Sequence, residues 1–492
     1  MKKRAQLSDG RVIEYVHKDK PPAGGMKKVY FTPDKKYALC FYKDPNAGRD
    51  SNRIARIQSI IGKYNPTVLR SKGGAAPDQK SADYYSQLFC WPVAIIEKPS
   101  LGILTPTYRK NFFFKSGKLK GKDKNGKWFS NQKLRKFLPP KELGDWYGYF
   151  SLCMRMARAL AKLHVTGLAH SDLSNNNVLV DPLTGQCSVI DIDSLVVPGR
   201  FPPDVLGTPG YIAPEVIKTR SLPPGDKNRV LPSNWTDLFA LGVLVYEYLL
   251  KRHPLRGPKI HDTTSAENDE RLAMGEKALF IEDPKDRSNR PGPDKKTLGF
   301  QKELSVTIDQ LGPFLARCFT KTFVEGLHHP KKRAVATRWL DAFVKTEDLL
   351  LKCGNSACKE KWFVFRGGGS CDCPWCGWRP SVPVPYLEFF YSPMPGQFRS
   401  ENRGMVGYDG REVREWHVFS SERLDETADH KALAKFTFHK NQWLLQNLAL
   451  DSMLSPSGNP VAYNQYIALK DGDEILLSRS TKGRLVKVKY VR

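Results

Sequence analysis

The sequence predicts a multidomain chain with an α+β region, then a small metal-binding unit, then an all-β sandwich. Three observations support this division. Strand-like and helical patterns are mixed up to residue 348, cysteines cluster between residues 353 and 376, and short strands separated by turn signals occupy the chain from residue 404. A length of 492 residues is sufficient for about two to four domains.

Composition and charge narrow the class of protein. The formal net charge is +27, which favours acidic partners, phosphate-rich ligands or nucleic acid. Most of the lysines are nevertheless expected to be solvated surface residues. No apolar run approaches the ~18 residues of a membrane span, and the N-terminus lacks the apolar core of a secretory signal. The cysteines are either single or gathered in one cluster, which predicts a reducing compartment, so we expect a cytoplasmic protein.

Strand patterns dominate the N-terminal part of the chain. Three runs have strand-like alternation: Val12–Val16, Val29–Phe31 and Tyr37–Tyr42. Apolar residues at helical spacing predict a helix over residues 50–64, and the composition of residues 71–83 predicts a loop. Two further strands are expected over residues 89–96 and 102–107.

A strongly basic stretch follows at residues 109–141, with aromatic residues among its lysines and arginines. The aromatic residues are Phe112, Phe113, Phe114, Trp128 and Phe129. Basic residues interleaved with aromatic ones can bind single-stranded nucleic acid. We favour a solvated loop or a docking site for an acidic partner over nucleic-acid binding.

A long helix that begins after Asp145 leads into the most informative stretch, residues 170–193. Two apolar runs flank a Pro-Leu-Thr-Gly turn there, and polar residues gather at their ends. Asp172 can accept a hydroxyl proton, and Asn177 and Asp191 offer the oxygen ligands that Mg²⁺ prefers. A base beside a metal clamp is what phosphoryl transfer requires.

The order of these residues resembles the catalytic loop and metal-binding Asp of protein kinases. Residues 207–215, Gly-Thr-Pro-Gly-Tyr-Ile-Ala-Pro-Glu, resemble the end of a Ser/Thr kinase activation segment. The resemblance implies a bilobal α+β protein kinase fold with ATP and Mg²⁺ between the lobes. It makes Asp172 the catalytic base, and Asn177, Asp191 and Asp193 the magnesium ligands.

The same resemblance assigns structural roles in the larger lobe. His170 would belong to the catalytic loop and Thr208 to the activation segment. Asp237 lies in a long apolar helix and would brace the backbone of the catalytic loop. Arg333 would be the buried partner of Glu215.

The lysine that contacts phosphate in kinases is displaced in this chain. Kinases place it on the third strand, where this sequence has Cys40. The pattern resembles the with-no-lysine kinases, in which a Lys on the second strand replaces it. We therefore predict Lys27 as the phosphate contact and Lys28 as the reserve, while Lys43 points to the opposite strand face. The alternative is that both are surface residues of a hairpin. The predicted helix over residues 50–64 also lacks the Glu that normally pairs with this Lys.

Two further parts of the nucleotide site follow from the resemblance. Gly24 and Gly25 form a turn that would cover the phosphates, because backbone N–H groups in such turns approach phosphate oxygens, although a glycine pair alone is usually only a hairpin turn. The adenine would hydrogen-bond to backbone between residues 105 and 108, where Thr105 and Thr107 lie.

Several departures from ordinary kinases point to a subgroup. Asp-Ile-Asp ends at Asp193 in place of Asp-Phe-Gly, Ser174 replaces a Lys, and residues 275–291 are unusual. Together they resemble bacterial kinases encoded with a von Willebrand A-type protein and a PP2C-type phosphatase in tellurite-resistance-associated gene triads. The resemblance implies these two proteins as partners beside protein substrates. Ser171 stands where an Arg usually precedes the catalytic Asp, so we expect activity that does not depend strictly on loop phosphorylation.

Four cysteines beyond residue 350 form two knuckles, Cys353 with Cys358 and Cys373 with Cys376. Four thiolates suit tetrahedral Zn²⁺ at a closed structural site, so we predict a zinc ribbon. Cys371 is spare. Redox chemistry at the Cys-x-x-Cys pair is the weaker alternative.

The C-terminal strands predict a β-sandwich. Residues 443–447 and 469–477 resemble an FHA domain, which implies phosphothreonine recognition, but the residues at 428–431 leave that site degenerate. The expected boundaries are 1–108 for the small kinase lobe, 109–348 for the large lobe with a basic insertion at 109–141, 349–380 for the zinc ribbon, 381–403 for a linker and 404–492 for the FHA-like sandwich.

The main hypothesis is thus a Ser/Thr protein kinase that uses ATP and Mg²⁺ and also phosphorylates itself. The alternative is a pseudokinase scaffold that binds nucleotide and assembles partners through its zinc-ribbon and FHA-like modules. The missing strand Lys and helix Glu favour the scaffold, whereas intact Asp172, Asn177 and Asp191 favour the enzyme.

Overall fold

The computed structural model describes residues 1–22, 25–68, 78–197, 200, 201, 203, 206–223, 225–292, 306–367, 371–394 and 396–492. The chain divides into two compact units. Unit 1 comprises Met1–Gly144, Gly148–Leu304 and Cys318–Leu340, and unit 2 comprises Asp145–Tyr147, Ser305–Arg317 and Asp341–Arg492.

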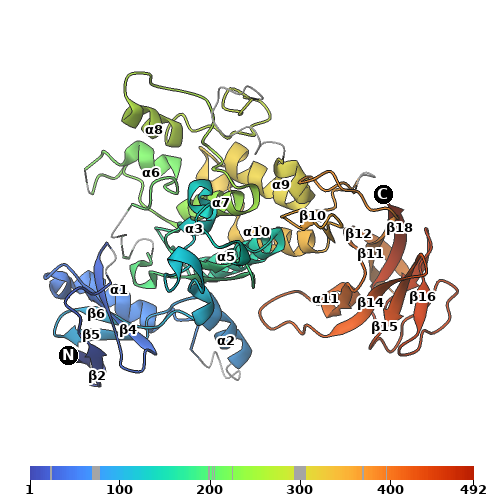
Figure 1. Cartoon of the computed structure of the whole chain (residues 1–492), viewed down its shortest axis with the longest axis horizontal. Coiled ribbons are helices and arrows are strands. Elements are labelled where there is room, and N and C mark those ends of the chain that lie inside the picture. Colours follow the sequence, from blue (N-terminus) through green and yellow to red (C-terminus); the bar gives the residue numbers. More distant parts are fainter. Residues whose placement is uncertain are drawn as a thin grey trace. The chain divides into compact units, whose positions relative to one another are not determined.

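Unit 1 begins with a closed barrel of strands in the order β1-β2-β3-β4-β6-β5 (blue in Figure 1). The strands are β1 Lys2–Leu7, β2 Val12–Val16, β3 Lys27–Phe31, β4 Tyr37–Tyr42, β5 Ala94–Lys98 and β6 Gly102–Pro106. Inward-facing apolar side chains such as Leu7, Leu39 and Leu104 form its core. The sequence did not predict β1, because Lys-Lys-Arg-Ala-Gln-Leu is mostly polar. Only Ala5 and Leu7 are buried there, at the alternate positions that a strand directs to one face.

Helix α1 (Ser51–Ile61) confirms the helix predicted over residues 50–64. The Asp50 side chain caps it by accepting from the backbone N–H of Arg53. Helix α2 (Gln79–Leu88) corrects the loop predicted over residues 71–83, of which residues 71–77 lie outside the described residues. Its helical pattern is carried by Ala82, Tyr85 and Leu88, which are buried.

The basic stretch at residues 109–141 is packed into unit 1. Phe112, Phe114 and Phe129 are buried, so these rings are core and are not available to stack on bases. Lys124 is also buried, with its Nζ 3.2 Å from Glu142 Oε2 and 3.1 Å from Asp181 Oδ1. A buried lysine needs such partners, and here they join the insertion to the rest of the unit.

Helices dominate the chain from residue 127 to residue 347, with one small hairpin among them. These elements are α3 Lys127–Ser130, α4 Gln132–Arg135, α5 Trp146–Val165, β7 Val178–Asp181, β8 Gln186–Val189, α6 Pro214–Thr219, α7 Asn234–Leu250, α8 Ala266–Met274, α9 Gly312–Thr320 and α10 Ala336–Glu347. Helix α5 begins directly after Asp145, as predicted. Helix α7 is buried on nearly all sides, which explains why its sequence is apolar all round. Among the described residues, no helix combines the length and apolar character needed to cross a bilayer.

Unit 2 contains a small two-stranded sheet and a sandwich. The small sheet pairs β9 (Leu350–Lys352) with β10 (Trp362–Val364) between the two cysteine knuckles. The sandwich consists of two antiparallel four-stranded sheets in the orders β12-β11-β18-β17 and β13-β14-β15-β16 (red in Figure 1). Its elements are β11 Val384–Met394, β12 Gln397–Val406, β13 Glu412–Arg414, α11 Glu415–Val418, β14 Ala432–His439, β15 Gln442–Asn447, β16 Tyr466–Ala468, β17 Glu474–Leu476 and β18 Leu485–Val491.

This arrangement confirms an all-β C-terminal region but corrects the linker predicted over residues 381–403. Those residues contain β11 and much of β12, and β11 also pairs with β18 at the C-terminus. The prediction was wrong because proline disfavours a strand assignment. Pro385 nevertheless pairs in register with Tyr490, and the apolar neighbours Leu387 and Phe389 are fully buried.

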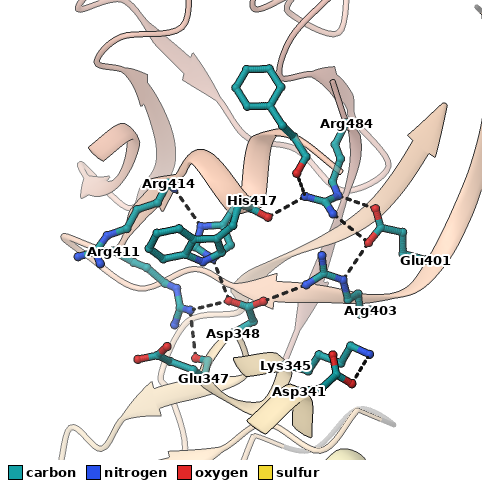
Figure 2. A network of polar contacts seen from close by, with 12 residues as sticks. Asp341, Lys345, Glu347, Asp348, Glu401, Arg403, Arg411, Arg414, His417 and Arg484 are labelled. Carbon is teal, nitrogen blue, oxygen red and sulfur yellow. Dashed lines mark hydrogen bonds and ion pairs between the residues drawn. The ribbon is translucent and has the colours of Figure 1, made fainter. Parts of the chain in front are cut away.

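A buried polar network, drawn in Figure 2, explains why the sandwich unit begins well before residue 404. Asp348, which lies between α10 and β9, has its carboxylate 3.0 Å from His417 Nε2, 3.6 Å from Arg411 and 3.5 Å from Arg403. His417 Nδ1 accepts from the backbone N–H of Arg414, so its Nε2 carries the proton that is donated to Asp348. These contacts fix the segment after α10 to β12, to Arg411 directly before β13, and to α11.

Candidate active site

The loop between α5 and β7 is held by a carboxylate from α7. Asp237 accepts from the backbone N–H of His170 at 2.7 Å and from that of Ser171 at 3.1 Å. The His164 ring lies 3.2 Å from the same carboxylate. The ring of His170 contacts the backbone oxygen of Ile190 at 3.0 Å. Asp237 therefore braces the loop backbone, as the sequence predicted, and His170 links it to the segment after β8.

Asp172 lies on this braced loop with both carboxylate oxygens engaged. Thr208 donates its hydroxyl to Oδ1 at 2.7 Å, and Asn177 donates its amide to Oδ2 at 3.0 Å. The Asn177 amide also donates to the backbone oxygen of Asp172 at 2.8 Å. Because its nitrogen makes both contacts, the Asn177 side-chain oxygen is left to serve as a metal ligand.

Asp191 follows β8 in the left-handed backbone region, with φ of 62°. Its backbone oxygen accepts from the Ser194 hydroxyl at 2.8 Å, which stabilises this turn. The Asp191 side chain is 35% exposed, and its Oδ1 lies 2.8 Å from Lys27 Nζ. Burial opposes the charge on Asp191, but Lys27 outweighs it, so its pKa lies below the usual value.

Lys27, on β3, reaches across to the segment after β8. Its Nζ lies 2.6 Å from Asp193 Oδ1 and 2.8 Å from Asp191 Oδ1. Burial alone would lower the pKa of Lys27, but the Asp193 and Asp191 carboxylates raise it well above its usual value. The neighbouring Lys28 and Lys43 are exposed. Of the three lysines considered from the sequence, Lys27 is the one that meets the carboxylates.

An ion pair anchors the segment that ends at Glu215. Both Glu215 oxygens accept from the Arg333 guanidinium, each at 2.7 Å. Arg333 also donates to the backbone oxygen of Trp235 at 2.8 Å. The partnership predicted between Arg333 and Glu215 is therefore present.

Comparison with known proteins agrees with this geometry. The family model of the protein kinase domain matches residues 130–325, which include the catalytic loop, Asp191, Glu215 and Asp237. The chain carries a protein kinase domain. The match begins well after Lys27 and ends before Arg333, so the placement of those two residues comes from the structure and not from the family model.

The relatives of this kinase domain include serine/threonine kinases. Death-associated protein kinase dapk-1 of Caenorhabditis elegans is 25% identical over 222 residues, which cover 40% of this chain and 15% of that protein. Serine/threonine-protein kinase RAD53 of Saccharomyces cerevisiae is 31% identical over 105 residues, covering 20% of this chain and 13% of that protein. The phosphorylase b kinase gamma catalytic chain, liver/testis isoform, of Rattus norvegicus is 31% identical over 105 residues, covering 21% of this chain and 25% of that protein.

This chain thus spans a quarter or less of the length of these relatives. Among solved structures, a Toxoplasma gondii specific rhoptry antigen kinase domain aligns with a TM-score of 0.40 and 15% identity, covering 70% of this chain and 84% of that one.

The predicted adenine and phosphate contacts of the kinase domain lie around β4 and β6. Gly24 lies outside the described residues, and Gly25 is exposed just before β3. Cys40, on β4, is half-buried, and burial raises the pKa of its thiol to about 11. Thr105 is buried on β6. The backbone N–H of Thr107 donates to the backbone oxygen of Lys36, which links Thr107 to the turn between β3 and β4.

Two contacts in the predicted nucleotide site were not recognised in the sequence. Asp193, predicted as a magnesium ligand, is 3% exposed and is paired with Lys27. The Tyr42 hydroxyl donates to the same Asp193 carboxylate. Tyr42 is the last residue of β4, directly before Lys43, and belongs to no motif that would have marked it.

Outside the kinase domain, the four predicted cysteines converge. The Sγ atoms of Cys353, Cys358, Cys373 and Cys376 lie within 4.8 Å of one another, which suits one tetrahedral ion. The second knuckle is closed by a hydrogen bond from the Gly377 backbone N–H to Cys373 O, with Gly377 at a φ of 74° that favours glycine. The remaining cysteine of the region, Cys371, is buried, and its backbone N–H donates to Arg492 O.

Proposed function

We propose that this chain is an ATP- and Mg²⁺-dependent serine/threonine protein kinase that transfers the γ-phosphate to a protein hydroxyl, including its own. The observation that carries the proposal is the setting of Asp172. Its carboxylate lies on a loop braced by Asp237 and is oriented by hydrogen bonds from Thr208 and Asn177. A carboxylate held in this way can orient a substrate hydroxyl and take its proton.

The oxygen donors of Asn177 and Asp191 fit Mg²⁺, which prefers carboxylate and carbonyl oxygens. When bound, Mg²⁺ neutralises charge on the β- and γ-phosphates. Lys27 supplies a positive charge beside Asp191 and replaces the one that is missing at Cys40. Catalysis then consists mainly of positioning and charge stabilisation.

The proposal is tested by measuring phosphate transfer from radiolabelled ATP to the protein itself and to a generic protein substrate. Asp172→Ala should lower the rate at least about 100-fold, because a positioned general base contributes on that order. Asp286→Ala, which removes a carboxylate 52% exposed on the same unit, is the matched control and should leave the rate unchanged. Transfer by Asp172→Ala at the wild-type rate would reject the assignment.

The phosphate contact is tested in the same assay. Lys27→Met should abolish most transfer, while Lys43→Met should retain it, because Lys27 Nζ lies 2.8 Å from Asp191 Oδ1 and Lys43 is exposed. Loss at Lys43 but not at Lys27 would overturn the lysine assignment.

A second candidate function is a pseudokinase scaffold that binds nucleotide without transfer. It is favoured by helix α1, whose residues Ser51–Ile61 contain no Glu to pair with a strand lysine. Nucleotide binding measured with and without Mg²⁺ separates the two. An enzyme should bind ATP more tightly when Mg²⁺ is present, whereas a scaffold without metal-assisted binding should not.

We further propose that the four-cysteine cluster holds a structural Zn²⁺. The supporting observation is the convergence of four Sγ atoms, three of them on buried cysteines. A closed site with four protein ligands stabilises a small unit and leaves no open position for catalysis.

The wider setting is also proposed from sequence resemblance. The two four-stranded sheets of unit 2 support an FHA-like module, whose degenerate phosphothreonine segment lies at residues 428–431. A von Willebrand A-type protein and a PP2C-type phosphatase are the proposed partners, in a cytoplasmic setting. Co-purification of the chain with each of the two would test the partnership.

A further inference from the structure

We infer that Asp193 is the residue that positions Lys27 in the nucleotide site, in place of a glutamate on helix α1, and that it is not a magnesium ligand. The inference rests on the proposed kinase function and deepens it. It assigns to Asp193 the positioning of Lys27, whereas the sequence predicted a magnesium ligand.

The first observation is that the buried lysine has its partner on an unexpected element. Asp193 lies in the short 3₁₀ turn Ile192–Ser194 directly after Asp191. Helix α1 contains neither Asp nor Glu, so it offers no carboxylate to Lys27. A buried ammonium needs a charged partner, and Asp193 provides it.

The second observation is that the contact is two-pronged. Lys27 Nζ lies 2.6 Å from Asp193 Oδ1 and 2.7 Å from Oδ2, and the Tyr42 hydroxyl donates to Oδ2. The Lys27 ammonium is also 5.5 Å from the centre of the Tyr42 ring. Both Asp193 oxygens are therefore engaged by β3 and β4 residues, and the three side chains form one cluster.

The third observation distinguishes the two aspartates by exposure. The Asp193 side chain is 3% exposed, whereas that of Asp191 is 35% exposed. Mg²⁺ loses its water reluctantly and usually keeps several water molecules, so it needs a carboxylate with open space around it. Asp191 satisfies this requirement and Asp193 does not. We therefore assign Asp191 to binding the metal and Asp193 to positioning Lys27.

A consequence concerns the control of the site. When a helix glutamate holds the lysine, displacement of that helix breaks the pair. Here the anchor belongs to the same segment as the metal-binding Asp191, so one backbone segment sets the positions of the metal ligand and the lysine together.

The discriminating variants are Asp193→Asn and Asp191→Asn, which each remove one charge and keep the side-chain size. Two measurements are made on the full chain. The first is the rate at which acetic anhydride labels Lys27 at one fixed neutral pH, read by mass spectrometry of a peptide that also contains Lys28. The exposed Lys28 is the internal control. The second is the Mg²⁺ concentration that gives half-maximal transfer, with kcat/KM for ATP.

Asp193→Asn should raise the labelling rate of Lys27 at a fixed neutral pH several-fold while that of Lys28 is unchanged, since the Lys27 ammonium loses the nearer of its two carboxylate partners. It should also lower kcat/KM for ATP about tenfold or more, with the half-maximal Mg²⁺ concentration unchanged. Asp191→Asn should instead raise the Mg²⁺ requirement. Tyr42→Phe removes one hydrogen bond to Asp193 and should change Lys27 labelling and kcat/KM in the same direction as Asp193→Asn, but less. It replaces Asp193→Asn in the test if that variant does not fold.

The inference is overturned if Asp193→Asn leaves Lys27 labelling unchanged, or if its main effect is a higher Mg²⁺ requirement. The labelling result is independent of catalysis. If the wild-type chain transfers no phosphate but Asp193→Asn still changes Lys27 labelling, the kinase proposal fails and the anchoring role stands.

Discussion

Arg333 and Glu215 form a two-pronged ion pair with both N–O distances at 2.7 Å, although they are separated by 118 residues. The Arg333 side chain is fully buried, and Glu215 is 17% exposed. Arg333 also donates to the backbone oxygens of Trp235, Gly326 and Leu327. The pair therefore ties the end of the activation segment to two other parts of the kinase domain.

Removal of Arg333 should be strongly destabilising, because it leaves a carboxylate and three backbone oxygens without their donor. We expect Arg333→Met to lower the free energy of unfolding by about 3–5 kcal/mol. The matched control is Arg256→Met, whose partner Glu270 is 52% exposed and whose loss should cost at most about 1 kcal/mol. Urea denaturation followed by tryptophan fluorescence measures both. Equal midpoints for the two variants would contradict the role given to Arg333.

The sequence predicted those parts of the site whose residues lie close together along the chain. Asp172 and Asn177 occupy one loop, and the Glu215 segment is a continuous motif, so their chemistry is readable along the chain. The Arg333 pairing came from family resemblance. The contact between Asp193 and Lys27 was not predicted, because the two residues lie 166 positions apart and the fold brings them together.

The fold itself was predicted less well wherever packing overrides composition. Strand β1 was missed because its polar residues face outward in a barrel that buries only alternate positions. The linker predicted over residues 381–403 was wrong, since burial of Leu387 and Phe389 holds a proline-containing strand between β12 and β18. In the basic insertion, the pattern of aromatics and lysines did not reveal that Phe112, Phe114 and Lys124 are core residues.

Removal of metal from the four-cysteine cluster should unfold the ribbon locally. Four thiolates brought within 4.8 Å of one another repel unless a cation lies between them. We expect the purified chain to contain about one Zn²⁺ per molecule by elemental analysis. Chelation should expose the β9–β10 region to proteolysis.

The neighbouring Cys371 provides a matched control for that experiment. It is buried in the same unit but is not one of the four converging thiols. Cys358→Ser should lose the bound metal, whereas Cys371→Ser should retain it. Metal content that falls equally in both variants would show that Cys371 substitutes for one of the proposed ligands.

The stability of the kinase domain should depend on pH through Glu247. Burial raises the pKa of this carboxyl from near 4.5 to about 8, and Tyr211 donates its hydroxyl to it. At pH values between about 4.5 and 8, Glu247 keeps its proton in the folded chain and has released it in the unfolded chain. Rising pH therefore destabilises the fold over this range. The slope for one proton is at most about 1.4 kcal/mol per pH unit.

Glu247→Gln removes this titration. The stability of the variant relative to the wild type should increase as pH rises from 5 to 8, measured as the difference in unfolding midpoints at each pH. Glu270→Gln, at an exposed carboxylate, is the control and should give a difference that is constant with pH. A constant difference for Glu247→Gln as well would mean that Glu247 does not hold a proton in the folded chain.

Phosphorylation of the activation segment should not be needed for activity. Between Asp191 and Glu215 the sequence contains three hydroxyl side chains, Ser194, Thr208 and Tyr211. The Ser194 hydroxyl donates to Asp191 O, that of Thr208 donates to Asp172, and that of Tyr211 donates to Glu247. Ser171 replaces the Arg that would receive a loop phosphate.

The hydroxyls of this segment are thus used inside the domain, and a phosphate on Thr208 would place a second negative charge beside Asp172. We expect chain treated with a phosphatase, and shown by intact mass to carry no phosphate, to keep at least about half of its initial transfer rate, since positioning of Asp172 comes from unmodified groups. Asp172→Ala, unable to phosphorylate itself, sets the background. A tenfold loss that returns on incubation with ATP would instead place an activating phosphate in the chain.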